Sequence, residues 1–508
     1  MKSSVAIRIV LTIAAAVLCT ASIVIAQPAA GPLTIQGLDQ FSISGVRSRA
    51  MGGTGVASAI DASALFSNPA ALAQLSSFEI RAGGLFNTTS RKQTQEWVPM
   101  RPLPGLSALF EGLTGNIKTP DSLGIAGLPL GAWSALQKQY DNLTPNWDKS
   151  SSAAHPLSLV AAMPLTLGSV NIVAAIGVSQ TINLDQYYQN NNSMSPYLGQ
   201  QRPDPFLITD RLDTLHVNWY QYTRTREGSA FGITPGVSFM PLPGLRIGAS
   251  ATILTGSSDD SERRQERGLV HIAIGDGKPN NFMVDTVYYS QARTGTSDYS
   301  GTLFTFGLHF QQERYSLGLT IRPPMSITRS WDREVTSVNT TRKPYPIGID
   351  DLVPGQYRES GKDEVNFPLS YSLGIVLKPT DKWMLAFDYE LRNLADVELT
   401  SGGATSHPWV NSKGEVRIGA EYRASTMLAL RGGFREDVQS FSPDGSAIVD
   451  EPARGGIYAL GAGISLGNIL IDLAYEYSVL KYQDIYQSNV NYNSRLQHQF
   501  MMEVAYRF

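Results

Sequence analysis

The C-terminal end of the chain alternates between large apolar side chains and smaller or polar ones. In an extended strand from His498 onward, one face would carry Phe500, Met502, Val504, Tyr506 and Phe508, and the other Gln499, Met501, Glu503, Ala505 and Arg507. Successive side chains of a β-strand point to opposite faces of the sheet. A strand between two aqueous faces needs no aromatic stripe, whereas a strand that faces lipid does. The pattern therefore predicts a lipid-facing strand.

The same alternation recurs along the chain in about fourteen segments, and an even number of strands is the rule for bacterial barrels. The predicted strands are residues 77–89, 156–163, 170–186, 230–240, 245–256, 300–311, 315–330, 365–378, 383–395, 413–423, 427–437, 455–466, 469–483 and 494–508. Short connections such as Pro241 to Gly244 alternate with long ones such as Arg91 to His155. A soluble β-sandwich has no reason to sort its turns in this way. We therefore predict an all-β fold, a membrane-spanning antiparallel barrel with periplasmic turns and extracellular loops.

Charge and composition agree with a barrel. An Arg or Lys on the lipid face costs about 2–4 kcal/mol at mid-membrane, so charged residues of the strands are expected to point into the lumen. The chain of 508 residues is rich in Gly (46) and Tyr (22) and offers no long uncharged apolar span after its first residues. The formal net charge of −3 gives no reason to expect nucleic acid as a partner.

The first residues have the pattern of a secretory signal peptide, with Lys2 and Arg8, an apolar run and a small-residue site at Ala26. The alternative, a membrane anchor, is disfavoured by the short and interrupted run. Cys19 is the only cysteine and would leave with the signal, so neither a disulfide nor a cysteine metal site is expected. The predicted division is a signal peptide at 1–26, an N-terminal extension and lumenal segment at 27–76, and the barrel at 77–508.

The stretch from Phe41 to Leu75 differs from the strands because small residues dominate it. Gly52, Gly53 and Gly55 permit backbone conformations that other residues resist. Asn68-Pro69 is a turn or breaker signal, since proline fixes its own φ and pushes the preceding residue out of the helical region. Such a compact segment has little surface of its own to bury, which predicts that it packs inside the barrel.

This stretch resembles the N-terminal segment of the FadL/TodX family of outer-membrane transporters for long-chain fatty acids and hydrocarbons. The matching residues are Phe41 to Gly45, Arg49 to Gly55, Asp61-Ala62-Ser63 and Asn68-Pro69-Ala70, with later motifs at Gly419 to Arg423 (GAEYR), Leu430 to Phe434 (LRGGF) and Asp472 to Tyr477 (DLAYEY). The resemblance implies a fourteen-stranded barrel whose lumen holds a small hatch that contains Gly52, Gly53, Gly55, Asn68, Pro69 and Ala70. The family pattern leaves Gln27 to Gln40 unmatched. PorV-like barrel proteins of secretion systems share a similar RAMGG…NPA segment.

The resemblance implies a passive diffusion channel for hydrophobic compounds, with release through a hatch-gated lumen or a lateral opening. The predicted capture loop, Arg91 to His155, carries apolar residues in a segment that should be solvated, among them Leu106, Leu109, Phe110, Leu113 and Trp133. Large exposed apolar patches usually mark binding. The alternative is that these residues form short helices packed on the barrel rim.

Inward arginines would meet a carboxylate cargo, because Arg suits bidentate carboxylate binding. The candidates are Arg81, Arg246, Arg322, Arg417 and Arg431, together with Arg423. The alternative is that they pair with lumen carboxylates such as Asp388, Glu415, Glu421 and Asp472.

The sequence has few signals for metal binding or catalysis. The six histidines have no metal spacing, and the acidic run at Ser258-Asp259-Asp260 is better explained as a solvated loop than as a calcium site. A phospholipase needs an activated serine, and no convincing Ser/His pairing is present, so neither an enzyme nor a cofactor is expected. The expected partners are a hydrophobic small molecule, outer-membrane lipid and the barrel-assembly machinery, the last through Phe508. The alternative function is that of a PorV-like barrel in secretion or a structural, protein-binding barrel.

Overall fold

The computed structural model describes residues 33–97, 146–167, 170–199, 214–273, 282–285, 289–339, 355–410, 414–443, 451–486 and 489–508. The predicted signal peptide and all five residues singled out in the capture loop lie outside these ranges. No helix within the described ranges is long and apolar enough to cross a membrane.

The described chain is mostly strand. The strands are β1 (Glu79–Trp97), β2 (Trp147–Leu167), β3 (Val170–Asn183), β4 (Gln186–Gly199), β5 (Thr214–Leu242), β6 (Leu245–Ala273), β7 (Phe282–Asp285), β8 (Tyr289–Gln311), β9 (Tyr315–Arg322), β10 (Met325–Asn339), β11 (Gly355–Phe367), β12 (Ser370–Leu377), β13 (Trp383–Arg392), β14 (Glu398–Ser401), β15 (Ala404–Ser406), β16 (Glu415–Arg423), β17 (Leu428–Val438), β18 (Arg454–Leu466), β19 (Ile469–Tyr486) and β20 (Asn489–Arg507). The short helices are α2 (Val46–Ala50), α3 (Ala64–Ser67), η1 (Pro69–Gln74) and η4 (Leu394–Asp396).

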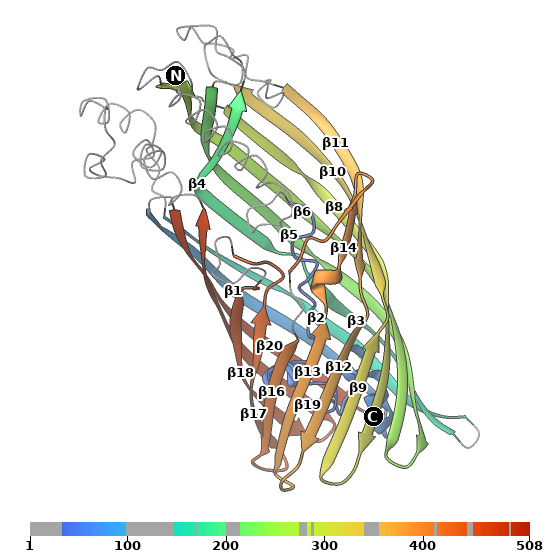
Figure 1. Ribbon diagram of the computed structural model, residues 1–508. Helices are drawn as coiled ribbons and strands as arrows, with labels where there is room; N and C mark the ends of the chain where they lie inside the picture. Colours follow the sequence, from blue (N-terminus) through green and yellow to red (C-terminus); the bar gives the residue numbers. More distant parts are fainter. Residues whose placement is uncertain are drawn as a thin grey trace, which may run out of the picture.

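These strands form a closed antiparallel barrel with 14 positions in the ring, as predicted (Figure 1). We call each position a stave; it is filled by one long strand or by two consecutive shorter ones. Each stave pairs with the next one along the chain, and β20 closes the ring on β1 from Glu79↔Arg507 to Trp97↔Asn489. Closure leaves no open sheet edge at the seam, which is how a β-protein satisfies its backbone groups in lipid. Four staves consist of two strands each, namely β3 with β4, β9 with β10, β11 with β12, and β13 with β14.

The interruptions within three of these staves lie side by side. Arg322, Ser370 and Arg392 are register partners across β9, β12 and β13, and each is the last or first residue before its stave breaks. Pro323-Pro324 follows the first of them and Pro368 precedes the second. Proline has no N–H to donate to a ladder, so it ends the regular pairing. The barrel therefore has a lower part and an outer part that meet at one level.

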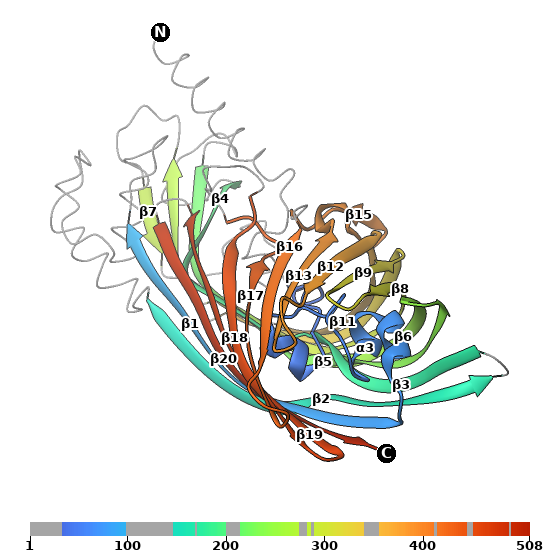
Figure 2. The ribbon, with the colours of Figure 1, turned by 90° about the horizontal axis from the view of Figure 1, so that it is seen from below.

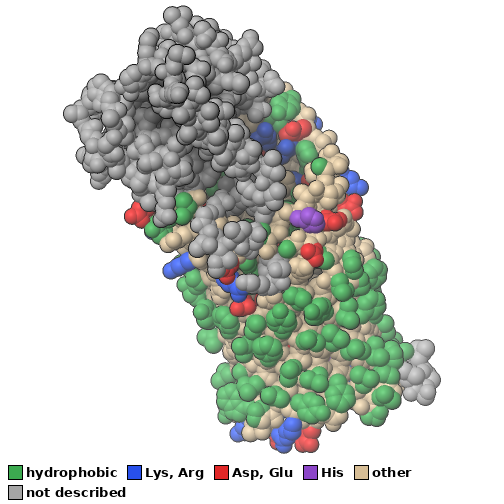
Figure 3. Space-filling model, in the orientation of Figure 1, with side chains coloured by type: hydrophobic (Ala, Val, Ile, Leu, Met, Phe, Trp, Pro, Cys, Tyr) green, Lys and Arg blue, Asp and Glu red, His purple; other side chains and the backbone are tan. Residues whose placement is uncertain are grey.

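The lower part carries an apolar exterior. Large exposed hydrophobic side chains surround it (Figure 3), and in β20 Phe500, Met502 and Val504 face out while Met501 and Glu503 are buried. In β13, Trp383 and Phe387 face out while Asp388 is buried. The predicted lipid face and the inward direction of these charges are confirmed.

The predicted strand ends on the extracellular side are wrong. β1 continues to Trp97 and β2 begins at Trp147, so part of the predicted loop from Arg91 to His155 is strand; β5 and β6 are likewise extended. These outer segments rise above the apolar band, where water wets the outer face. The apolar alternation on which the prediction rested is therefore absent there. The predicted strands 315–330 and 365–378 run through interruptions, whereas nearly all of β4 and all of β14 lie outside the predicted strands.

The N-terminal segment lies inside the barrel. Seen from below, the chain around α2 and α3 lies within the ring of strands (Figure 2). α3 ends before Asn68, whose backbone is extended, and η1 starts at Pro69, so the predicted turn at Asn68-Pro69 is confirmed. Apolar residues of the N-terminal segment pack on inward residues of β2 and β3, including Val160 and Val173.

Candidate functional site

Two buried arginines fasten the hatch, residues 43–75, to the wall. Both lie on α2: Arg47 pairs with Glu421 of β16 at 3.0 Å, and Arg49 pairs with Glu476 of β19 at 3.1 Å. Arg435 of β17 donates to the same Glu476 carboxylate. Sequence reasoning missed both hatch arginines because it treated the segment as a small-residue one. Charge complementarity was the available signal, since charged strand residues such as Glu421 were already expected in the lumen.

A wall carboxylate also holds the loop that follows α2. Oδ2 of Asp388 accepts hydrogen bonds from the backbone N–H of Gly55, at 2.7 Å, and of Val56, at 2.9 Å. Asp388 is buried in β13. A buried carboxylate that accepts two backbone donors satisfies groups that the loop could not pair internally. The hatch thus contacts the wall through its main chain as well as its side chains.

Glycine on both surfaces allows close approach of hatch and wall. Gly52 and Gly53 have φ of 69° and 87°, a region that L side chains rarely adopt. A Cβ added at wall residue Gly433 would collide with the backbone of Gly52, and one at Gly419 would collide with Met51. Gly55 lies against Ser67 within the hatch.

The Asn68-Pro69-Ala70 turn is seated on the opposite wall. Nδ2 of Asn68 donates to Val56 O at 2.6 Å and to Leu308 O at 3.0 Å, and its Oδ1 accepts from the N–H of Ala70 at 3.1 Å. A Cβ at wall residue Gly248 would lie 2.5 Å from Ala70 N. The turn therefore joins two parts of the hatch to β8.

The predicted lumen arginines fall into two groups. Arg322 and Arg417 line the cavity described below, and both pair with Glu390. The other three lie outside its lining. Arg81 contacts Glu79, Asp472, Glu503 and Asp61, Arg431 contacts Glu421 and Asp472, and Arg246 donates to Gln311. Arg423 pairs with Glu421 from an exposed position. Contact of any of them with a ligand stays a prediction.

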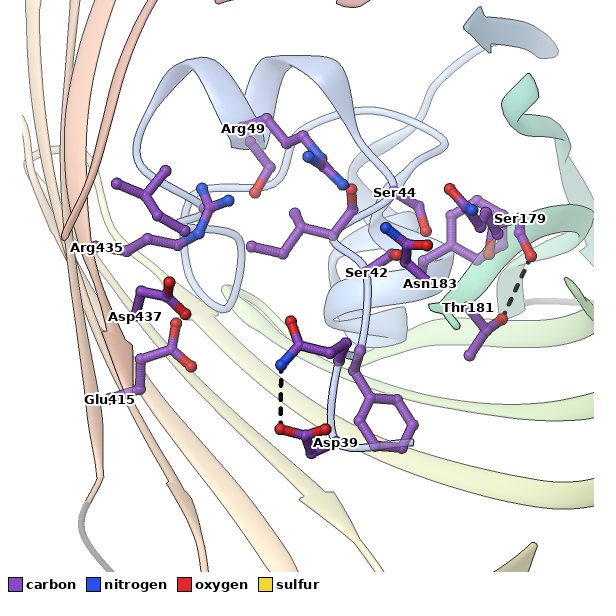
Figure 4. A pocket seen from close by; sticks show the side chains of 18 of the residues that line it. Asp39, Ser42, Ser44, Arg49, Ser179, Thr181, Asn183, Glu415, Arg435 and Asp437 are labelled. Atoms are coloured by element: carbon purple, nitrogen blue, oxygen red, sulfur yellow. Dashed lines mark hydrogen bonds between the residues drawn. The ribbon is translucent and has the colours of Figure 1, made fainter. Parts of the chain in front are cut away.

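A cavity of about 650 Å³ lies on the outer side of the hatch, whose helices are at the top of the view in Figure 4. Glu415, Arg435 and Asp437 stand on one side of it, and Ser179, Thr181 and Asn183 on the other. Apolar side chains line it as well, among them Phe41, Ile43, Val56, Leu65, Phe66, Leu303, Met325, Phe367, Leu394 and Ile457. The lining combines apolar and polar surface, which suits a ligand that has an apolar part and a polar part.

The strand pairing of the wall is interrupted beside this cavity. β2 pairs with β3 only as far as Ser158↔Ser179, and above this pair the described residues provide β2 with no strand partner on that side. Higher up, the rings of Trp147 and Tyr187 meet at 5.6 Å, so β2 and β4 touch again. We call the space between these two contacts the window. Ser151, Ser152, His155, Thr181 and Asn183 flank it and line the cavity.

The described residues were compared with the ligand sets that metal ions need. They contain no group of three or more His, Cys, Asp or Glu that could hold a metal ion. The carboxylates around the hatch are instead engaged by arginines and backbone N–H groups.

Comparison with known structures identifies the fold. The crystal structure of a Pseudomonas aeruginosa FadL homologue matches with a TM-score of 0.56 at 15% identity, covering 92% of this chain and 98% of that one. The P. putida toluene transporter TodX matches with a TM-score of 0.55 at 15% identity over 93% and 99%. The CymD monoaromatic hydrocarbon channel matches with a TM-score of 0.51 at 14% identity over 93% and 99%. No family profile and no curated protein sequence matches the chain.

A closed barrel with an apolar exterior and a lumenal plug is an integral protein of the bacterial outer membrane. Its fold is that of the FadL and TodX channels, and the predicted resemblance is confirmed at the level of the fold.

Proposed function

We propose that the protein is a passive outer-membrane channel for hydrophobic compounds, which reach the cavity from outside and leave sideways through the window. The observation that carries this proposal is the juxtaposition of three features. A partly apolar cavity lies directly above a fastened hatch and beside the window between β2 and the stave formed by β3 and β4.

The hatch contacts favour lateral release over release into the periplasm. Moving the hatch downward would separate Arg47 from Glu421 and Arg49 from Glu476, and all four groups are buried. Breaking a buried ion pair leaves an uncompensated charge and costs about 3–5 kcal/mol. Passage through the window breaks none of these contacts.

The hydrophobic effect favours the movement of an apolar compound from water into the bilayer. An apolar molecule gains about 25 cal/mol for each Å² of surface removed from water, so its overall transfer from water through the cavity into the bilayer needs no other energy source. The known neighbours include a toluene transporter and a monoaromatic hydrocarbon channel. We extend the same chemical class, together with fatty acids, to this chain. Leu106, Leu109, Phe110, Leu113 and Trp133 remain the proposed capture surface.

The window route is tested by narrowing the window. Ser151→Trp and Thr181→Trp place an indole on its two edges, whereas Thr305→Trp places one on β8 in the same cavity. We expect uptake of radiolabelled fatty acid or toluene by cells to fall at least about tenfold for the two window variants. The Thr305→Trp variant should retain more uptake, because it fills cavity volume without obstructing the window. Equal uptake by all three variants and the wild type would refute lateral release.

A further inference from the structure

Two basic side chains on the periplasmic side of the hatch have no carboxylate partner among the described residues. The short turns that join the strands mark this end of the barrel, which is the lower end in Figure 1. Arg246 is the second residue of β6 after such a turn, and Lys378 is the first residue after β12. Neither residue lines the cavity on the outer side of the hatch. They therefore belong to a part of the lumen that the proposed lateral route does not cross.

The contacts of Arg246 leave one edge of its guanidinium group unused. Its Nη1 donates to Oε1 of Gln311 at 3.0 Å and to Nδ1 of His309 at 3.2 Å. Nε2 of His309 in turn donates to the backbone carbonyl of Ala57 in the hatch, at 3.2 Å. A guanidinium group can only donate and a carbonyl can only accept, so these contacts define His309 as a neutral imidazole. Nε of Arg246 is buried and has no hydrogen-bond partner among the described residues, and such a group calls for a ligand or ion.

Lys378 lies in a surplus of positive charge. The residue is partly buried, and burial lowers the pKa of its ammonium group. The charges of Arg423, Arg47 and Arg246 lower this pKa further. Glu421 acts in the opposite direction, but three arginines already contact its carboxylate. An anion bound beside Lys378 would therefore relieve repulsion that the described carboxylates leave in place.

The wall places these cations along one arc of the periplasmic mouth. Arg246 is the register partner of His309 across β6 and β8, β8 pairs with β9, and β9 pairs with β12, which Lys378 follows. Neighbouring strands lie about 4.8 Å apart, so the backbones at Arg246 and Lys378 are separated by about 14 Å across the wall. Two long basic side chains can meet at a shared ligand over this span. Arg423 lies on β16, two strands beyond β12, and is largely exposed.

We propose that Arg246 and Lys378 bind an oxyanion of the phosphate class that enters from the periplasm, with Arg423 at the rim of the site. The unused edge of the guanidinium group, Nε and Nη2, matches two oxygens of a phosphate, and the ammonium group supplies a third donor. Several positive charges favour a dianionic phosphate over a monovalent ion such as chloride. Free phosphate and the headgroup of a phospholipid from the inner leaflet both offer this chemistry.

The first test titrates inorganic phosphate into purified, detergent-solubilised protein and measures binding by calorimetry at constant ionic strength. Arg246→Gln removes the unused guanidinium edge, and Lys378→Gln removes the ammonium group. Arg314→Gln is the matched control, because Arg314 is exposed on an adjacent turn and pairs with Asp381 at 2.9 Å. We expect the Kd for phosphate to rise at least about tenfold in each site variant and to change little in the control. Failure of the wild type to bind phosphate, or equal weakening in all three variants, would overturn the proposal.

The second test locates the anion in the wild-type protein, so it does not depend on the folding of a variant. Crystals soaked in arsenate, a phosphate analogue with an anomalous signal, should show a peak between Arg246 and Lys378. Absence of a peak there would overturn the site. A short-chain phosphatidylglycerol then identifies the source: competition with phosphate supports a lipid headgroup, and its absence supports free phosphate. Neither test measures uptake, so the anion site is judged independently of the proposed channel function.

Discussion

The contact between α2 and β19 gives the sharpest prediction about the hatch. Glu476 accepts hydrogen bonds from two arginines, Arg49 of the hatch and Arg435 of the wall, and all three side chains are buried. The two ends of the Arg49–Glu476 pair are therefore not equivalent. Removal of Arg49 leaves Glu476 with Arg435, whereas removal of the Glu476 charge leaves two buried arginines without it.

The expected costs follow from this asymmetry. Arg49→Met loses the charge-assisted hydrogen bond to Glu476, worth about 1.5–3 kcal/mol, together with hydrogen bonds to Ile43 O and Gln499, but leaves no buried charge unpaired. Glu476→Gln keeps the shape of the side chain but leaves the buried Arg49 and Arg435 without this counter-charge, which costs about 3–5 kcal/mol. Each 1.4 kcal/mol is tenfold in population, so opening of the hatch should become roughly 10²-fold to several thousandfold more frequent in Glu476→Gln. Arg49→Met should show a smaller increase.

Amide hydrogen exchange measures this opening directly. In purified protein, exchange of a peptide that covers Val46–Ala50 reports local release of α2. Glu436→Gln is the matched control, because Glu436 is partly exposed and its contact with Arg454 is long, at 3.8 Å. It should leave the exchange of α2 unchanged. If Glu476→Gln exchanges no faster than Arg49→Met, the ion pairs do not hold the hatch and the argument for lateral release loses its basis.

Three further predictions concern the seat of the turn, the lipid face and the barrel itself. Gly307→Ala places a methyl group against Oδ1 of Asn68 and should loosen η1, seen as faster proteolysis of the hatch in a barrel that still folds; unchanged proteolysis would contradict the close fit. Leu373→Arg puts a charge on the exposed face of β12 and should lower the free energy of unfolding by about 2–4 kcal/mol in lipid, a loss that Leu373→Met should not show. An unboiled sample should migrate differently from a boiled one on a denaturing gel, and identical migration would contradict a closed barrel.

The lipid face could be predicted from the sequence because a two-residue period and the cost of charge in lipid together dictate it. Phe500, Met502 and Val504 face out as their alternation requires. The Asn68-Pro69 turn was likewise predictable, since proline restricts local backbone geometry whatever surrounds it. Both the alternation and the proline restriction act within a few residues, so contacts with distant parts of the chain do not change them.

The outer barrel and the contacts of the lumen depend on residues far apart in the chain. Above the membrane, the strand alternation loses its apolar side, so the outer parts of β5 and β6 resembled loops. Pro323-Pro324 was a visible warning that the stave from 315 to 330 is interrupted. The partner of Arg49 lies 427 positions away, and no local pattern identifies which lumen carboxylate an arginine will meet.

Identification of the molecule that accompanies the purified protein tests the central claim most directly. Gently extracted wild-type protein and the Thr181→Trp window variant would be compared by mass spectrometry of bound small molecules. The proposed function predicts a fatty acid or hydrocarbon in both, with higher occupancy in the variant because its route out is narrowed. A lumen that is consistently empty, together with unchanged hydrocarbon and fatty-acid uptake when the gene is deleted, would contradict it.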